Sequence, residues 1–200
     1  NYFHANGYKE QANRVVFLGS LDWLPNEDGV QYFARDVWPI VRRRHPDATF
    51  QIVGRNPSRE IQRLHDGAGV DVVGTVPDVR PYLGQAAVVV VPLLVGGGTR
   101  IKIVEAMAMG KAIVSTSIGA EGLPVKPGEH LLLANSPDQF AERVCDLLAN
   151  EEQRTRLGRV ARELVTQKYT AEGVARQFEA ICMQTVESSQ RVRTETATAL

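Results

Sequence analysis

A glycine-rich loop followed by two cations and an acid lies near the middle of the chain. In chain order these residues are Gly96, Gly97, Gly98, Thr99, Arg100, Lys102 and Glu105. Consecutive glycines let the backbone approach a ligand closely, and the start of a following helix offers unpaired N–H groups with a partial positive charge. We expect Thr99 to cap that helix and the two cations to add full charges. The pattern predicts an anion site suited to phosphate; the alternative is a glycine turn with solvent-facing cations.

Glu105 is the only acid in the apolar helical run that follows the loop. A buried carboxylate needs hydrogen-bond donors. If the helix begins at a ligand cleft, Glu105 can accept hydrogen bonds from two neighbouring hydroxyls of a sugar ring. The alternative is a structural acid that is satisfied by loop N–H groups, by Arg100 or by Lys102.

Short apolar runs alternate with helical patterns as far as Ala134. Several runs are apolar at every position, as in Val88–Val91, and such strands are typical of a parallel sheet covered by helices on both faces. We therefore predict an α/β fold with a Rossmann-like, doubly wound parallel sheet of about six strands, followed by C-terminal helices. The predicted strands are residues 14–18, 49–53, 70–73, 86–91, 111–115 and 131–134.

Helical spacing of apolar residues predicts the elements between and after these strands. Helices are expected over residues 27–44, 58–65 and 99–109, and Pro39 is expected to kink or end the first of them. After the last strand, Ser136 followed by Pro137 is typical of a helix start, and further apolar stripes predict helices up to residue 186.

The loops that follow the strands are the expected walls of a ligand site, because ligands of open α/β sheets collect beyond the carboxyl ends of the strands. Gly19 and Ser20 follow the first strand, Arg55 the second and Val76 the third. We assign these four residues, together with residues 96–99, to ligand binding. The chain has neither a GxGxxG nor a Walker motif, which disfavours a dinucleotide dehydrogenase and a P-loop enzyme.

Composition excludes several kinds of partner. Lys plus Arg and Asp plus Glu number 23 each, so no overall charge attracts the protein to nucleic acid. Cys145 and Cys182 are expected to pack as small apolar side chains in helices. The four histidines have no metal-ligand spacing and no Asp-x-Asp motif occurs, so we expect no metal. No apolar run is long enough for a transmembrane segment, and we expect a cytoplasmic protein, either free or peripheral at the inner membrane face.

The segment from Pro92 to Leu123, PLLVGGGTRIKIVEAMAMGKAIVSTSIGAEGL, resembles the donor-site segment of retaining glycosyltransferases of the GT-B fold, family four (glycosyl transferases group 1). The segments GSLDWLPNEDGVQYF and VGTVPDVRPYL look like the first and third loops of the same family. Glu105 matches the second glutamate of the family's E-x7-E pair, which the resemblance implies to hold ribose hydroxyls. The first glutamate falls on Gly97, and the family's first-loop arginine falls on Ser20. The family's lysine a few residues later falls among Pro25, Asn26 and Glu27, so both usual diphosphate cations are absent from their places.

The resemblance implies transfer of a sugar from a nucleoside-diphosphate sugar to an acceptor hydroxyl with retention, in polysaccharide or glycoconjugate synthesis. Because the usual cations are missing, we predict that Arg100 and Lys102 replace them on the diphosphate and act catalytically with Glu105. Backbone N–H groups of residues 96–99 would then contact the donor sugar. The backbone around Thr75 to Val79, which includes Val76, would recognise the base, with Arg55 beside the base or the phosphates. No cofactor is implied beyond the donor.

The resemblance implies that the chain has three parts. Residues 1–13 are interpreted as a linker from a missing N-terminal acceptor domain, residues 14–186 as the nucleotide-sugar (donor) binding domain, and residues 187–200 as a disordered tail. The acceptor would be a glycan or a lipid-linked glycan. Two alternatives remain open: a catalytically weak nucleotide-sugar binding module, and a sugar-nucleotide epimerase of the same architecture, for which only Glu105, Glu121 and His130 could supply the acid and base.

Overall fold

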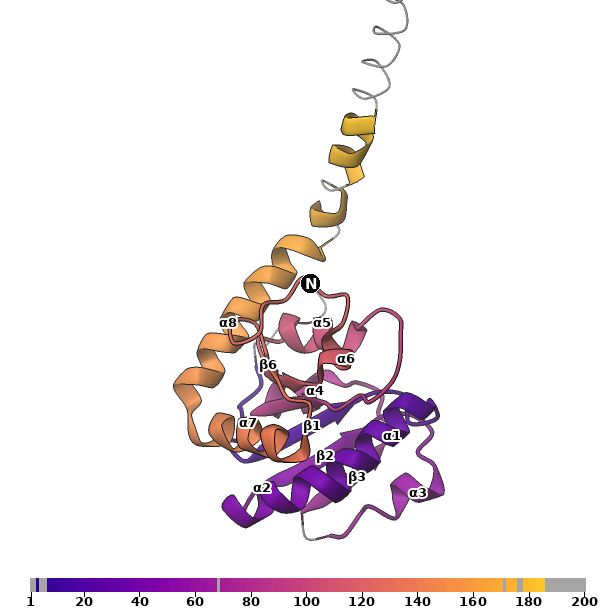
Figure 1. The fold of residues 1–200 in the computed structure, drawn as a ribbon, viewed down its shortest axis with the longest axis vertical. Helices are drawn as coiled ribbons and strands as arrows, with labels where there is room; N and C mark the ends of the chain where they lie inside the picture. Colours follow the sequence, from indigo (N-terminus) through magenta and orange to yellow (C-terminus); the bar gives the residue numbers. More distant parts are fainter. Residues whose placement is uncertain (1–2, 4–6, 68, 171, 176–177, 186–200) are drawn as a thin grey trace, which may run out of the picture. The chain divides into compact units, whose positions relative to one another are not determined.

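The computed structural model describes residues 3, 7–67, 69–170, 172–175 and 178–185 (Figure 1). The chain divides into two compact units, residues 1–162 and residues 163–200. The sheet and the candidate site both belong to the first unit. The tail expected over residues 187–200 lies outside the described residues, as does His4.

A parallel sheet of six strands forms the centre of the first unit (Figure 1). The strand order is β3-β2-β1-β4-β5-β6, so the order reverses between β1 and β4, the place where open α/β sheets bind ligands. All four residues of β4 are buried, as their unbroken apolar character predicts. The predicted Rossmann-like sheet is confirmed. Its strands are β1 (Arg14–Leu18), β2 (Thr49–Val53), β3 (Val70–Gly74), β4 (Val88–Val91), β5 (Ala112–Ser115) and β6 (Leu132–Leu133).

The predicted first helix is present, but it begins earlier and contains a π-helical turn. It consists of α1 (Leu24–Tyr32), the π-helical segment η1 (Phe33–Val37) and α2 (Trp38–Arg44). Pro39 lies at the start of α2, and because it has no N–H the regular hydrogen-bond pattern cannot continue through it. The N–H of Trp38 instead reaches back to the carbonyl oxygen of Phe33. The effect of Pro39 is therefore a widened turn before it and not an early end.

Further helices follow among the described residues, of which α4 and α6 were not anticipated. Ser58 and Ser136 cap α3 and α7 with their side chains, and the start predicted at Ser136 is confirmed. The cap predicted at Thr99 is wrong: α5 begins one residue later, with Arg100 at the cap position and no side-chain cap. The helices are α3 (Arg59–Gln62), α4 (Arg80–Gln85), α5 (Ile101–Ala108), α6 (Ser117–Ala120), α7 (Pro137–Ala149) and α8 (Glu151–Lys168).

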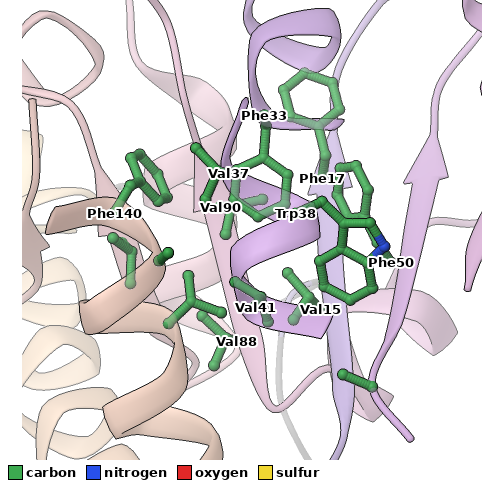
Figure 2. Close-up of a cluster of buried hydrophobic side chains, with 14 of the residues drawn as sticks. Val15, Phe17, Phe33, Val37, Trp38, Val41, Phe50, Val88, Val90 and Phe140 are labelled. Atoms are coloured by element: carbon green, nitrogen blue, oxygen red, sulfur yellow. The ribbon is translucent and has the colours of Figure 1, made fainter. Parts of the chain in front are cut away.

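A cluster of buried hydrophobic side chains, several of them aromatic, fills one face of the sheet, between the strands and the helices α1, α2 and α7 (Figure 2). The ring centroid of Phe33 lies 4.7 Å from that of Phe50 and 5.5 Å from that of Phe140. Alternate strand residues such as Val16 and Val89 point to the opposite face and are buried too, so both faces are covered as predicted.

The two cysteines differ. Cys145 is buried in α7, which confirms the packing predicted for it. Cys182 is exposed in the structure, so the packing predicted for that residue is not found.

The described part of the N-terminal segment, residues 7–13, contacts the rest of the first unit, in part through the side chain of Glu10. Its carboxylate lies 3.1 Å from Lys111 Nζ and 2.9 Å from Arg154 Nε. Both cations are buried, and burial lowers the pKa of Lys111. One carboxylate thus pairs with two buried cations, and this ties the segment to the amino end of β5 and to α8.

Candidate functional site

The loops after β1 and β2 touch at the carboxyl edge of the sheet. The N–H of Gly19 donates to the carbonyl of Val53, and the N–H of Leu21 donates to that of Arg55. A Cβ atom at Gly54 would lie 1.7 Å from the carbonyl oxygen of Gly19, so only glycine permits this approach. The structure therefore brings Gly19, Ser20 and Arg55 together, as the strand order requires.

Ser20 is the centre of a polar network between these two loops. Arg55 Nε donates to Ser20 Oγ at 2.8 Å, and Ser20 Oγ donates to Asp22 Oδ1 at 2.5 Å. Asn56 Nδ2 donates to the other carboxylate oxygen of Asp22 at 2.8 Å. Hydrogen bonds from Asn56 and Ser20 lower the pKa of Asp22, so this carboxylate is ionised and draws Arg55 toward Ser20. A guanidinium is thereby held beside the position where the sequence lacks the expected arginine.

Lys102 reaches back from α5 to the end of β1. Its ammonium group donates a hydrogen bond to Asn26 Oδ1 and lies 4.7 Å from the centre of the Phe17 ring. A Cβ atom at Gly19 would lie 2.8 Å from Lys102 Nζ, so the lysine lies directly on the Gly19 backbone. Asn26 also donates to the carbonyl of Ser20 at 2.7 Å. Lys102 and Arg55 are therefore the two cations linked to Ser20, one through Asn26 and one directly.

Burial shifts the pKa values of the two charged residues of α5, Lys102 and Glu105, in opposite directions. The pKa of Lys102 is lowered to about 8, first by burial and then by the charge of Arg100, while Glu105 opposes the shift. Burial raises the pKa of Glu105, and Lys102 opposes that shift. Among the described residues the Glu105 carboxylate has no hydrogen bond and no ion pair within 4.0 Å. A half-buried acid without a donor fits a group that hydrogen-bonds a ligand, in contrast to a satisfied structural acid.

Arg100 has a different environment from Lys102: its guanidinium is buried and surrounded by backbone carbonyl groups. Its Nη1 donates to Gly97 O at 3.2 Å, and its Nη2 donates to Gly96 O at 3.2 Å and to Ile118 O at 2.7 Å. Its Nε donates to Glu121 O at 3.4 Å, and the Glu121 carboxylate lies 3.5 Å from Nη2. Arg100 thus connects the glycine loop to the loop around α6.

The glycine loop itself lies against the loop after β1. A Cβ atom at Gly96 would be 3.6 Å from Trp23 Cη2 and 3.5 Å from Pro25 Cβ. Gly96 and Gly98 have φ angles of 133° and 94°, values that favour glycine. Gly97, Gly98 and Thr99 are exposed. The loop is therefore open to solvent at the edge where Ser20 and Lys102 lie.

The remaining sequence candidates have simpler environments. Val76 is half-buried in the loop between β3 and α4, on the far side of β2 from the glycine loop. His130 is buried, and its Nδ1 accepts a hydrogen bond from the N–H of Lys126. Asn26, only 2% exposed and hydrogen-bonded to both Lys102 and Ser20, was not assigned to the site from the sequence, although the family's first-loop lysine falls among residues 25–27. Its position at the start of α1, facing the end of β1, was the signal available.

No group of three or more His, Cys, Asp and Glu side chains that could hold a metal ion is found among the residues that the structure describes. Within the same residues, no helix has the length and apolar character needed to cross a membrane.

Solved structures share this fold. The C-terminal domain of the group 1 glycosyl transferase LpcC from Francisella tularensis matches with a TM-score of 0.71 at 19% identity, covering 84% of this chain and 96% of that chain. HepE from Anabaena, in complex with UDP and glucose, matches with a TM-score of 0.63 at 16% identity, covering 86% of this chain and 48% of that chain. The strand order and these matches define the class of fold as the Rossmann-like half of a GT-B fold.

Sequence similarity then gives the family. Residues 12–150 match the family described as glycosyl transferases group 1, and the chain belongs to this family. Phosphatidyl-myo-inositol mannosyltransferase from Mycobacterium tuberculosis is 31% identical over 147 residues, which are 70% of this chain and 38% of that protein. The chain spans between 37% and 41% of the length of the curated relatives it matches.

Proposed function

We propose that this chain is the donor-binding half of a glycosyltransferase that moves a sugar from a nucleoside-diphosphate sugar to an acceptor hydroxyl with retention. One observation carries the proposal: Lys102 and Arg55 are both linked to Ser20 at the carboxyl edge of the sheet. The exposed glycine loop lies at the same edge, and so does Glu105, whose carboxylate accepts no hydrogen bond from a described residue. Two cations at a strand-order reversal suit a diphosphate. The family and the UDP in the HepE structure support the same class of ligand.

Each group has a role in binding the donor. Lys102 and Arg55 neutralise the diphosphate, and Glu105 accepts hydrogen bonds from the ribose hydroxyls. Residues 96–99 contact the donor sugar or the phosphate next to it through backbone N–H groups, and the loop around Val76 recognises the base. The Glu105 carboxylate has no hydrogen bond among the described residues, and burying a carboxylate without donors costs free energy. The ribose hydroxyls would supply the missing donors.

During sugar transfer the site must stabilise the diphosphate as a leaving group. The bond between the anomeric carbon and the diphosphate oxygen breaks with its electron pair on the diphosphate. The acceptor oxygen bonds to the anomeric carbon, and its proton passes to the departing diphosphate. Negative charge grows on the diphosphate in the transition state, and the Lys102 ammonium is preorganised to stabilise it because Asn26 and the Gly19 backbone already fix its position.

The acceptor would be bound by a further domain. The chain spans little more than a third of the length of its curated relatives, and exposed apolar side chains surround the site edge. We propose that an N-terminal domain covers this edge and presents a glycan or lipid-linked glycan acceptor, in a cytoplasmic enzyme that is free or peripheral at the inner membrane face. The exposed residues are Trp23, Leu24, Leu94, Val95, Ile101 and Ile118.

Titration calorimetry tests the donor site directly. The chain is titrated with UDP, GDP and ADP, as the unchanged protein and as the Lys102→Met and Glu105→Gln variants. Lys168→Met, which changes an exposed lysine on α8, is the matched control. We expect one nucleotide to bind the unchanged chain and the control alike, and about tenfold more weakly to each site variant.

Binding without turnover would identify the weak binding module instead. Transfer is measured with the full-length protein and the sugar conjugate of the nucleotide that binds, followed by product analysis. An epimerised sugar nucleotide would support the epimerase alternative, which the structure disfavours because Glu121 is paired with Arg100 and His130 with a backbone N–H. No nucleotide binding by the unchanged protein would refute the proposed function.

A further inference from the structure

Arg100 is the charged residue of the glycine loop that the proposed chemistry leaves without a ligand contact. Its side chain is 6% exposed, and four hydrogen bonds join it to backbone carbonyl oxygens. A guanidinium has five N–H donors in a rigid planar fork. With most of these donors occupied by carbonyl groups, the guanidinium is held in place on the inner side of the loop.

The two loop carbonyls that Arg100 holds determine where the neighbouring N–H groups point. In a trans peptide unit, the C=O of one residue and the N–H of the next point in opposite directions, and the described residues contain no cis peptide bond. Because Gly96 O and Gly97 O point toward the buried guanidinium, the N–H groups of Gly97 and Gly98 point away from it, toward the exposed side of the loop. Neither N–H donates a hydrogen bond to another described residue.

The outward N–H groups lie at the edge where the donor is proposed to bind. Gly96 packs against Trp23 and Pro25, where the loop after β1 meets the start of α1, and Ser20 and Asn26 lie in the same two segments. The other carbonyls held by Arg100 belong to Ile118 and Glu121, on either side of the end of α6. Arg100 therefore fixes the glycine loop relative to a second loop of the same sheet edge.

We propose that Arg100 is a positioning residue, which holds the carbonyls of Gly96 and Gly97 and so turns the N–H groups of Gly97 and Gly98 toward the phosphate or sugar oxygens of the donor. This inference rests on the proposed function and replaces the direct diphosphate contact first expected of Arg100. It also explains how position 97 can contribute without a carboxylate, because the backbone supplies the contact.

Arg100→Lys separates a positioning role from a charge role. Lysine keeps the positive charge but has a compact ammonium group that cannot bridge the carbonyls of two loops as a planar fork does. A positioning role predicts that Arg100→Lys and Arg100→Gln are equally harmful, each lowering kcat/KM for the donor about tenfold to 100-fold in the full-length enzyme. The loss should be the same at low and high salt, since no charge contact with the ligand is removed. Arg156→Lys, on the exposed side of α8, is the matched control.

The unchanged protein provides a second measurement that does not depend on whether the variants fold. With 15N-labelled glycine, the amide resonances of Gly97 and Gly98 are followed during titration with the nucleotide that binds. We expect both resonances to shift when the nucleotide binds.

Three results would overturn the inference while leaving the donor site intact. They are nucleotide binding without movement of the Gly97 and Gly98 resonances, near-normal kcat/KM in Arg100→Lys, and a loss that disappears at high salt. Failure of the proposed function would look different, because the unchanged protein would then bind no nucleotide.

Discussion

The buried ammonium group of Lys102 predicts that this domain becomes more stable as the pH rises above 8. The pKa of Lys102 is lowered from its usual value of 10.5 to about 8, chiefly by burial. Between these two values the unfolded chain carries a proton on Lys102 that the folded chain has lost. Stability rises with pH wherever the unfolded state binds more protons, so Lys102 contributes a gain between pH 8 and pH 10.5.

The size of the gain follows from the two pKa values. With pKa values of about 8 folded and 10.5 unfolded, the contribution is near zero at pH 7 and reaches about 2 kcal/mol at pH 9.5. Removal of the group in Lys102→Met abolishes this pH dependence. The variant also avoids the cost of burying an ammonium at neutral pH, although it leaves Asn26 Oδ1 without its hydrogen bond.

Urea unfolding of the chain at pH 7.0 and pH 9.5 measures the effect. Other groups titrate over the same interval, so the relevant quantity is the pH-induced change in unfolding free energy for the unchanged protein minus the change for Lys102→Met. We expect about 2 kcal/mol for this difference, and close to zero when Lys168→Met replaces Lys102→Met in the comparison. A difference below about 0.5 kcal/mol would show that Lys102 keeps an ordinary pKa and that the ammonium is not desolvated.

Three further predictions concern the site and its support. Donor affinity should fall about tenfold between pH 7 and pH 9, because binding favours a charged Lys102 whose pKa is about 8; calorimetry would contradict this if Lys102→Met showed the same fall. Glu10→Gln leaves two buried cations without their carboxylate and should lower the unfolding free energy by about 2 kcal/mol, with donor KM unchanged; equal urea midpoints for variant and parent would refute the pairing. Gly54→Ala places a Cβ atom 1.7 Å from Gly19 O and should cost about 3 kcal/mol or prevent folding. Gly97→Ala, which meets nothing within 4 Å, should melt like the parent, and equal melting of both glycine variants would disprove the close approach.

Local pattern was sufficient to predict the sheet. A strand such as Val88–Val91, apolar at every position, can be buried only between two layers of helices, and all six strands appeared at the predicted places. Capping at Ser136 was also predictable, because serine followed by proline satisfies the first turn of a helix locally. The cap predicted at Thr99 is absent, because the glycines before it leave the backbone free to begin the helix one residue later.

The roles of the two cations after the glycine loop depended on contacts between distant segments. Arg100 and Lys102 are two residues apart on a helix start, so their side chains leave the helix in different directions. Sequence spacing gave both the same expected role, yet one meets Ile118 and Glu121 and the other meets Asn26 and Phe17.

The sequence by itself determined the family, the order of strands and helices, and the loops at which a ligand site is expected. These depend on residue types over short stretches, where apolar periodicity and glycine content decide the local conformation. The tertiary structure decided which side chains reach that site, because Arg55, Lys102 and Asn26 come together only when β1, β2 and α5 are packed at one edge of the sheet. Burial, which lowers the pKa of Lys102 and raises that of Glu105, is likewise a property of the packed chain and of no single segment.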